Sequence, residues 1–263
     1  MNYLQDGHIY LMNTEALSSE DIAFYFRSIL STDERERAER CRIPSRFRQF
    51  VAGRALLRTA LQKYFNEPTS AIEFAVGLYG KPYIAKPIHS GVVFNLSYQP
   101  NFVAIAMGRL GLLPENPFGV GIDIVEIPVH HSEMGAFQTY LSLNEIEYIN
   151  SSGEDQICVH FAEVWSAKEA LGKAIGTGLF TPVRQLSQIG SIFHRSPTRS
   201  VFWYHVEEDN LMLSVCAPKR SPLYHFCRLN SVFQPMTEVP AIFAEKDFTV
   251  SLSSANVLSM LSN

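Results

Sequence analysis

Two segments about forty residues apart hold the most informative pattern in the sequence: Gly119-Val-Gly-Ile-Asp-Ile-Val-Glu-Ile127 and Trp165-Ser-Ala-Lys-Glu-Ala-Leu-Gly-Lys-Ala-Ile-Gly-Thr-Gly178. β-Branched residues and glycines dominate the first, which predicts a buried strand, and an acid there needs a partner because an unpaired buried carboxylate is costly. The second has the pattern of an amphipathic helix with Glu169 and Lys173 on one face. Asp123 and Glu169 are therefore expected to be carboxylates on rigid elements beside lysines, which suits Mg²⁺ and a phosphorylated substrate.

The composition is that of a globular protein, because 46% of the 263 residues are apolar and 18% are charged. A net charge of −4 gives no general attraction for nucleic acid or an anionic membrane, so a phosphate site would need a local basic cluster. The sequence shows neither a signal-peptide pattern nor an apolar stretch long enough for a membrane span, which favours a cytoplasmic protein. The four cysteines are widely spaced, which favours reduced thiols.

The first part of the chain, residues 1–118, is expected to form one lobe. Its periodicity predicts strands at 8–12, 72–76, 92–96 and 102–107, and helices at 22–30, from 31 onward and at 45–65. The segment 110–118 contains one glycine and two prolines, so it is predicted to link two lobes.

The second part, residues 119–229, is expected to form another lobe with a similar order of elements. It contains predicted helices at 134–141, 143–150 and 156–175, and predicted strands at 119–127, 188–193, 201–206 and 211–217. Residues 230–263 are rich in proline and serine and are expected to be a loosely packed tail.

The segments 119–127 and 165–178 together resemble the signature of the 4'-phosphopantetheinyl transferases, roughly (V/I)G(I/V)D, a gap of about forty residues, then (F/W)(S/C/T)xKE(A/S)xxK. Weaker matches lie upstream in family order: an arginine-rich segment at 33–58, Gly80-Lys-Pro82 and Phe94-Asn-Leu-Ser97. The chain is most similar to the two-lobed type typified by the surfactin-synthetase activating enzyme. Such enzymes use Mg²⁺ to move the phosphopantetheine arm of coenzyme A onto a serine of an apo acyl or peptidyl carrier protein.

The resemblance also implies a fold. It is an α+β architecture of two pseudo-symmetric lobes, each a small, mostly antiparallel sheet packed against a long helix, with the active site between the lobes. A chain that supplies both lobes itself is expected to act as a monomer. The resemblance implies carrier docking around residues 128–160, where basic residues are scarce, so we expect apolar and hydrogen-bonded contacts there.

By resemblance, Asp123 binds Mg²⁺, and Glu169 binds the metal and is a candidate base for the carrier serine. Many two-lobed members carry a second strand acid where this chain has Val125, and the acid one residue further, Glu126, should face the other side unless the strand is bulged. Members that lack this acid have a glutamine after the Phe-Asn-x-Ser motif. Gln99 is therefore the expected third oxygen donor, with an ordinary turn residue as the alternative.

The resemblance assigns further residues to coenzyme A. Lys173 matches the lysine beside the pyrophosphate and joins Asp123 and Glu169 among the expected catalytic residues. Tyr98 replaces a phosphate-binding histidine, and because a phenol carries no positive charge near neutral pH, Lys81 or Lys173 would supply that charge. The other expected coenzyme-binding residues are Arg37, Arg48, Pro82, Ser97 and Lys168, although a solvated helix face stays open for each arginine. Glu34 stands at the position of a family lysine.

Two other functions stay open. Tyr98 and Val125 motivate a catalytically silent module that binds coenzyme A or a carrier protein. A Mg²⁺-dependent phosphodiesterase or nuclease would need more clustered acids and a basic groove. Asp123 and Glu169 favour the transferase, but the sequence does not identify which carrier is modified. Phe161 and Trp165 are expected in the core.

Overall fold

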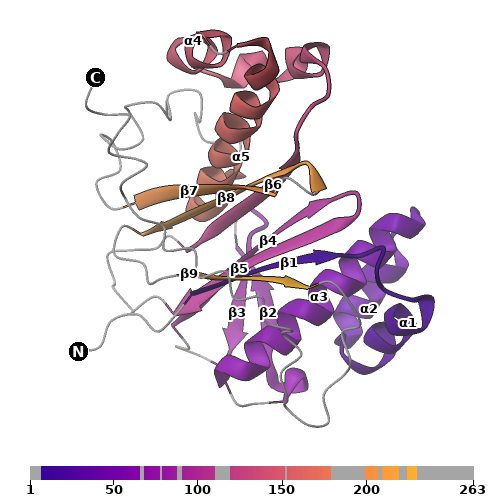
Figure 1. Ribbon diagram of the computed structural model, residues 1–263. Coiled ribbons are helices and arrows are strands. Elements are labelled where there is room, and N and C mark those ends of the chain that lie inside the picture. The colour runs from indigo at the N-terminus through magenta and orange to yellow at the C-terminus, as the bar shows by residue number, and fades with distance from the viewer. Residues whose placement is uncertain are drawn as a thin grey trace. The chain divides into compact units, whose positions relative to one another are not determined.

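The computed structural model describes residues 7–65, 68–77, 79–87, 91–109, 119–151, 153–178, 199–206, 209–218 and 224–229. These residues fall into two compact α+β units (Figure 1). The first unit contains the described residues up to 109 together with strand β9 (Tyr224–Leu229), and the second contains those from 119 to 218. The predicted linker at 110–118, the predicted strand at 188–193 and the predicted tail at 230–263 lie outside the described residues.

The first unit contains three helices: α1 (Ser19–Ser28), α2 (Thr32–Glu39) and α3 (Pro44–Phe65). Helix α1 begins at a capping box in which Ser18 and Asp21 exchange side-chain-to-backbone hydrogen bonds, and α2 begins in the same way with Ser31 and Glu34. Helix α3 begins at a proline, which lacks the N–H that a first helical residue cannot pair. These start signals explain why the helices predicted from sequence form close to their predicted bounds.

The strands of the first unit are β1 (Gly7–Asn13), β2 (Glu73–Val76), β3 (Pro82–Lys86), β4 (Val92–Gln99), β5 (Phe102–Arg109) and β9. They form a four-stranded sheet in the order β4-β5-β1-β9 and a separate pair β2-β3, which follows the short 3₁₀ helix η1 (Thr69–Ala71). All neighbours are antiparallel except β1 and β9, which are parallel. Helix α3 packs against the sheet, and its Leu57 and Leu61 share one core with Ile105 and Met107 of β5.

Strand β9 corrects the predicted extent of the second lobe, residues 119–229. Residues 224–229 pair with β1, so the chain returns to the first unit after passing through the second. A parallel neighbour comes from a distant part of the chain, and the local sequence pattern gives no sign of the partner.

The second unit has a sheet in the order β6-β8-β7, with both pairings antiparallel. Its elements are β6 (Gly121–Glu126), η2 (His131–Tyr140), α4 (Leu143–Ser151), η3 (Glu154–Gln156), α5 (Ile157–Ile175), β7 (Arg199–Val206) and β8 (Leu211–Pro218). Helix α5 contacts the sheet and ends at Gly176, whose φ of 86° is left-handed. Phe161 and Trp165 lie in a hydrophobic core beside Leu141 and Ile149, as predicted. Each unit therefore pairs a small sheet with one long helix, which confirms the expected fold class.

Two further observations concern cysteines and helix length. Among the described side chains, Cys41, Cys158 and Cys216 are not joined in disulfide bonds. Within the described ranges, neither α3 nor α5 nor any shorter helix combines the length and the apolar content needed to cross a lipid bilayer.

Strand β6 and helix α5 approach each other most closely at Gly121. A Cβ at this position would lie 1.9 Å from the carbonyl oxygen of Ala170 and 2.5 Å from the amide nitrogen of Ala174. Both are helix backbone atoms, which cannot rotate away as a side chain can. A glycine is therefore required at residue 121 for this contact.

We expect Gly121→Ala to lower the free energy of unfolding by about 1–3 kcal/mol or more, because α5 must move away from the sheet to admit the methyl group. Urea unfolding followed by circular dichroism measures this change. Gly135→Ala is the matched control, since a Cβ on Gly135 meets nothing within 4 Å. Equal stability of the two variants would contradict the close contact.

Candidate active site

The second unit holds an ion pair that joins its sheet to its long helix. Asp123 lies on β6 and is only 6% exposed, and its Oδ1 accepts a hydrogen bond of 2.6 Å from Nζ of Lys173 on α5. The buried strand acid therefore has the partner that the sequence predicted it would need. The side chain of Lys173 is 25% exposed, so it is more accessible than the buried carboxylate that it pairs with.

Glu169 lies on α5 one turn before Lys173 and is half-buried. Burial raises the pKa of the Glu169 carboxyl, the nearby Asp123 carboxylate raises it further, and the ammonium group of Lys173 opposes both effects. The two carboxylates that the sequence pattern singled out are thus close enough to interact. Glu169 is the acid in this group that holds a proton more readily than an ordinary glutamate does.

Lys168, which the resemblance assigns to coenzyme A binding, lies in the interior of the second unit instead. Its Nζ donates hydrogen bonds of 2.9 and 2.7 Å to the two carboxylate oxygens of Glu145 on α4, and both side chains are fully buried. Burial lowers the pKa of the Lys168 ammonium, while the hydrogen bonds and charge of Glu145 oppose this. The side chain is inaccessible to a ligand here, so its predicted role in binding coenzyme A is replaced by a structural one.

Three polar contacts hold α5 in place around Glu169. The Lys168–Glu145 pair joins α5 to α4, and the Lys173–Asp123 pair joins it to β6. A third contact, 2.7 Å between the hydroxyl oxygens of Ser166 and Ser214, joins it to β8 in the buried interior. The sequence reasoning did not identify Glu145. Glu145 could have been predicted from its position three residues after Ser142, because a serine and a glutamate at this spacing form a capping box, as they do at the start of α4.

The strand register decides between the two acids of β6. Strand β6 pairs with β8 residue by residue from Gly121 to Glu126 without a bulge. Val125 therefore lies on the Asp123 side of the strand, while Glu126 lies on the opposite side and is exposed. Glu126 is excluded as a metal ligand beside Asp123.

The first unit contains a pocket of about 650 Å³ next to Tyr98. The pocket is lined by Cys41, Ile43, Ser45, Arg46, Gln49, Phe50, Tyr98, Gln99 and Pro100. The side-chain amide of Gln49 donates hydrogen bonds to the carbonyl oxygens of Gln99 and Pro100, which fixes the turn after β4. Gln99 is half-buried at the end of β4, and its expected role as a metal ligand stays a prediction.

Tyr98 is anchored by the hydroxyl end of its ring. The residue is 39% exposed overall, yet a Cβ on Gly53 of α3 would lie 2.9 Å from the Tyr98 hydroxyl oxygen, so this end packs against the helix. Burial there raises the pKa of the Tyr98 phenol, and the nearby charge of Arg54 opposes this. The phenol is neutral near pH 7 and acts as a hydrogen-bond donor rather than a cation.

The other expected coenzyme-binding residues of the first unit are spread over several elements. Arg48 is engaged with the backbone, since its Nη1 donates to the carbonyl oxygens of Thr14 and Leu17 at 3.2 and 2.5 Å. Arg37 is exposed on α2, with its guanidinium 5.8 Å from the ring centre of Phe50. Lys81 and Pro82 are half-buried at the start of β3, and Ser97 is buried on β4. For these residues coenzyme binding stays a prediction.

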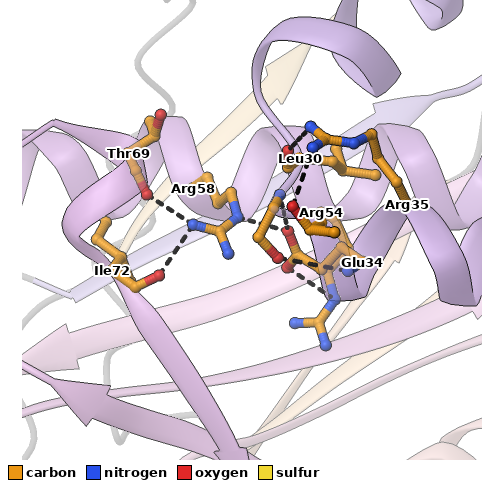
Figure 2. Close-up of polar contacts among 9 residues, drawn as sticks. Leu30, Glu34, Arg35, Arg54, Arg58, Thr69 and Ile72 are labelled. Atoms are coloured by element: carbon orange, nitrogen blue, oxygen red, sulfur yellow. Dashed lines mark hydrogen bonds and ion pairs between the residues drawn. The ribbon is translucent and has the colours of Figure 1, made fainter.

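A buried charge cluster of the first unit was missed by the sequence reasoning. Glu34 of α2 meets Arg54 and Arg58 of α3, as Figure 2 shows, and all three are at most 6% exposed. The sequence marked the segment 33–58 as rich in arginine but gave no reason to prefer these two. The two arginines could have been singled out by their i,i+4 spacing on a helix, because the positions next to them are apolar and this face is therefore expected to be buried.

Comparison with known proteins gives two family matches. Residues 119–216 match the model of the 4'-phosphopantetheinyl transferase superfamily, and residues 18–109 match the model of the N-terminal part of 4'-phosphopantetheinyl transferase. The two matched ranges do not overlap, and together they cover more than half of the chain. Each of the two units thus matches a model of the same family.

Curated relatives carry the same description. The 4'-phosphopantetheinyl transferase HetI of Nostoc sp. is 32% identical over 57% of this chain and 61% of its own length. The 4'-phosphopantetheinyl transferase gsp of Aneurinibacillus migulanus is 30% identical over 51% and 50%, and psf-1 of Bacillus pumilus is 28% identical over 76% and 83%. Against HetI and gsp the chain therefore spans about half to two thirds of the relative's length. A solved holo-(acyl-carrier-protein) synthase from Bacillus anthracis matches 42% of this chain and 99% of its own at 20% identity, with a TM-score of 0.37, too low to support an argument.

The buried Lys168–Glu145 pair predicts a large loss of stability when one partner is removed. We expect Lys168→Met to lower the free energy of unfolding by about 3–5 kcal/mol, because it leaves a carboxylate buried without its cation. The double variant Lys168→Met/Glu145→Gln should recover most of this loss. Urea unfolding measures both, with Lys86→Met as the control, since the Lys86–Glu73 pair is exposed and should cost less than about 1 kcal/mol. Equal losses in Lys168→Met and the control would contradict the structural role.

The raised pKa of Glu169 predicts a pH dependence of stability in metal-free protein. Above about pH 4.3, the ordinary value for glutamate, the unfolded chain loses this proton before the folded chain does, so the contribution of Glu169 to the free energy of unfolding falls as pH rises. In Glu169→Gln the side chain at this position has no ionisable proton, so its contribution to stability does not change with pH. The free energy of unfolding of Glu169→Gln minus that of wild type, measured by urea unfolding, should therefore be smallest near pH 4 and should increase towards pH 8. Glu147→Gln, at an exposed position on α4, is the control, and an advantage that shrinks with rising pH would contradict the raised pKa.

Proposed function

Because the chain belongs to the 4'-phosphopantetheinyl transferase superfamily, we propose that it transfers the 4'-phosphopantetheine arm of coenzyme A to a serine hydroxyl of an apo carrier protein and releases 3',5'-ADP. The observation that carries the proposal is the meeting of Asp123, Glu169 and Lys173 on β6 and α5. Two interacting carboxylates beside an ammonium group suit a reaction in which a hydroxyl attacks a charged phosphate.

The two carboxylates fit Mg²⁺. This ion prefers oxygen ligands and is commonly held by one or two carboxylates, with water and substrate phosphates completing its shell. Asp123 and Glu169 are the side chains proposed to hold it, because their carboxylates are close enough to interact. Bound there, Mg²⁺ would offset the negative charge of the pyrophosphate and of the leaving group.

Glu169 is the proposed general base. A serine hydroxyl is a poor nucleophile until its proton is removed, and a base works best when its pKa lies near the working pH. Burial and the charge of Asp123 raise the pKa of Glu169 towards that range. The carboxylate of Glu169 therefore takes the proton from the carrier serine as the serine oxygen attacks.

Lys173 is proposed to stabilise the charge that the reaction moves. The serine oxygen forms a bond to the phosphorus that carries the pantetheine arm, and the bond from this phosphorus to the bridging oxygen breaks. The bridging oxygen leaves with the electron pair as part of 3',5'-ADP. An ammonium group held beside Asp123 on a partly exposed side chain would stabilise this anion.

The pocket of the first unit is the proposed binding place for the nucleotide part of coenzyme A. It combines the aromatic faces of Phe50 and Tyr98, which suit an adenine ring, with the cation of Arg46. The ring of Tyr98 would contact the nucleotide, because its hydroxyl end is packed against α3. The cation of Arg46 would contact the phosphates.

The carrier protein is proposed to dock on the 128–160 region of the second unit. Three apolar residues there are exposed: Val129 at 73%, Tyr140 at 41% and Leu143 at 82%. The region contains no lysine or arginine, so apolar contacts rather than salt bridges would dominate. We further propose that the protein works in the cytoplasm as a monomer, where coenzyme A and carrier proteins are available.

The decisive experiment is intact mass spectrometry of apo carrier proteins incubated with the purified protein, coenzyme A and Mg²⁺. We expect the carrier to gain one phosphopantetheine, and we expect Asp123→Ala and Glu169→Ala each to lower the rate by about 10²–10⁴-fold. Removal of Mg²⁺ with a chelator should abolish the gain. Glu126→Ala is the control on the same strand, because Glu126 is exposed on the opposite face and should leave the rate nearly unchanged.

The outcome separates the functions that the sequence left open. Binding of coenzyme A without any mass gain across several classes of carrier would indicate a silent binding module. Cleavage of DNA with Mg²⁺ would indicate a nuclease. Full activity of Asp123→Ala and Glu169→Ala would contradict the proposed site even if transfer occurs.

A further inference from the structure

The interior of the first unit contains two arginines and one acid that contact each other. Nε of Arg58 donates a 2.6 Å hydrogen bond to Oε2 of Glu34, and Nε of Arg54 lies 3.5 Å from Oε1 of the same carboxylate (Figure 2). All three side chains are nearly inaccessible, with Arg58 at 2% and Arg54 at 6% exposure. The cluster therefore carries one positive charge that is not balanced within it.

The unbalanced charge is located on Arg54. Arg58 is well satisfied, since its Nη1 also donates to the carbonyl oxygens of Thr69 and Ile72 at 2.6 and 3.0 Å. In the described part of the chain, by contrast, Nη1 of Arg54 is buried without a hydrogen-bond partner, as is Oε1 of Glu34, which lies 3.5 Å from Nε of Arg54. Burial lowers the pKa of Arg54, although a guanidinium stays charged in proteins. A buried cation with an unused donor is costly unless an anion compensates it.

Arg54 lies beside the pocket of the first unit. Its guanidinium carbon is 5.7 Å from the ring centre of Phe50, and the residue before it, Gly53, packs against the hydroxyl end of Tyr98. Phe50 and Tyr98 both line the pocket, so the ring next to the buried charge also faces the pocket space. A charge in a low-dielectric interior acts over several ångströms with little screening. The pocket wall is therefore electropositive even though Tyr98 itself is neutral.

We propose that Arg54 is a specificity-determining residue, whose buried charge selects the phosphorylated nucleotide end of coenzyme A over an uncharged nucleoside in this pocket. The inference rests on the proposed function, since that function places coenzyme A here. Glu34 sets the strength of the effect, because its carboxylate cancels part of the positive charge. Arg54 acts through the field behind Phe50 and Tyr98, while these two rings make the direct contacts.

Calorimetric titration of the folded full-length protein with 3',5'-ADP and with adenosine tests the proposal without any need for transfer. We expect wild type to bind 3',5'-ADP more tightly than adenosine. Arg54→Met should weaken binding of 3',5'-ADP by about tenfold or more and leave adenosine binding nearly unchanged, whereas Arg54→Lys should restore part of the difference. Arg27→Met is the control, because it removes the same charge at an exposed position on α1, where solvent screens it.

Glu34→Gln gives the sharper test, because the proposal predicts that this variant gains affinity for 3',5'-ADP. Glutamine keeps the acceptor that pairs with the Ser31 amide in the capping box of α2 and can still accept from Arg58, while the negative charge is lost. We expect this variant to bind 3',5'-ADP several-fold more tightly than wild type, with adenosine unchanged. A purely structural role of the cluster predicts weaker binding in both Glu34→Gln and Arg54→Met, and this result would overturn the proposal. If Arg54→Met does not fold, as judged by circular dichroism, Glu34→Gln alone decides.

The two proposals fail in different ways. If Arg54→Met keeps the wild-type preference for 3',5'-ADP while the wild-type protein modifies a carrier, the role of Arg54 is overturned and the transferase stays intact. A clear preference that depends on Arg54, together with no modification of any carrier, would overturn the transferase and retain an anion-selective pocket. Equal affinity of wild type for 3',5'-ADP and adenosine overturns the role of Arg54 directly.

Discussion

The second unit depends on the contact between β6 and α5. At Gly121 the strand backbone approaches the helix backbone so closely that no side chain fits, and two residues further along the strand Asp123 pairs with Lys173. Close backbone packing makes this geometry rigid because neither partner can shift without disturbing the core. Glu169 and its raised pKa follow from the same contact, since the carboxylate is placed near Asp123 by the position of the helix and not by a flexible loop.

Two buried charge clusters in the described part of the chain illustrate opposite uses of burial. Lys168 and Glu145 are balanced one to one, with both carboxylate oxygens hydrogen-bonded, so the pair fixes α4 against α5 and has no charge left for a ligand. Glu34, Arg54 and Arg58 are unbalanced, and one guanidinium nitrogen has no partner among the described residues. A satisfied pair is what a structural element requires, whereas an unsatisfied cation beside a pocket is typical of a site that receives an anion.

The sequence predicted the parts of the molecule whose causes are local. The helix starts at Ser18 and Ser31, the end of α5 at Gly176 and the opposite orientations of Asp123 and Glu126 follow from neighbouring residues alone. The meeting of Asp123 with Glu169 is not local, and it was expected because the two segments that carry these residues resemble a family signature.

The misplaced features depend on distant partners. Lys168 precedes the proposed base in sequence, yet its ammonium turns to Glu145 on another helix. Strand β3 was missed because its short sequence reads as part of a turn, and Arg54 was not distinguished from other arginines because its environment is made by Phe50, Phe74 and Glu34. Burial and pairing of this kind are tertiary properties that a single sequence does not display.

Strand β9 determines when the sheet of the first unit is completed during synthesis. The sheet of the first unit ends at β1 until residues 224–229 arrive, and the whole second unit is translated in between. Until then β1 is an open edge with unpaired backbone groups, which is a template for pairing with other chains. Domains usually fold in the order in which they emerge from the ribosome. Here the first unit emerges first, but its sheet is completed last, when β9 has been synthesised. A nascent or truncated chain that ends after the second unit would therefore be at risk of aggregation through its N-terminal sheet, even though every residue of the proposed catalytic group is already present.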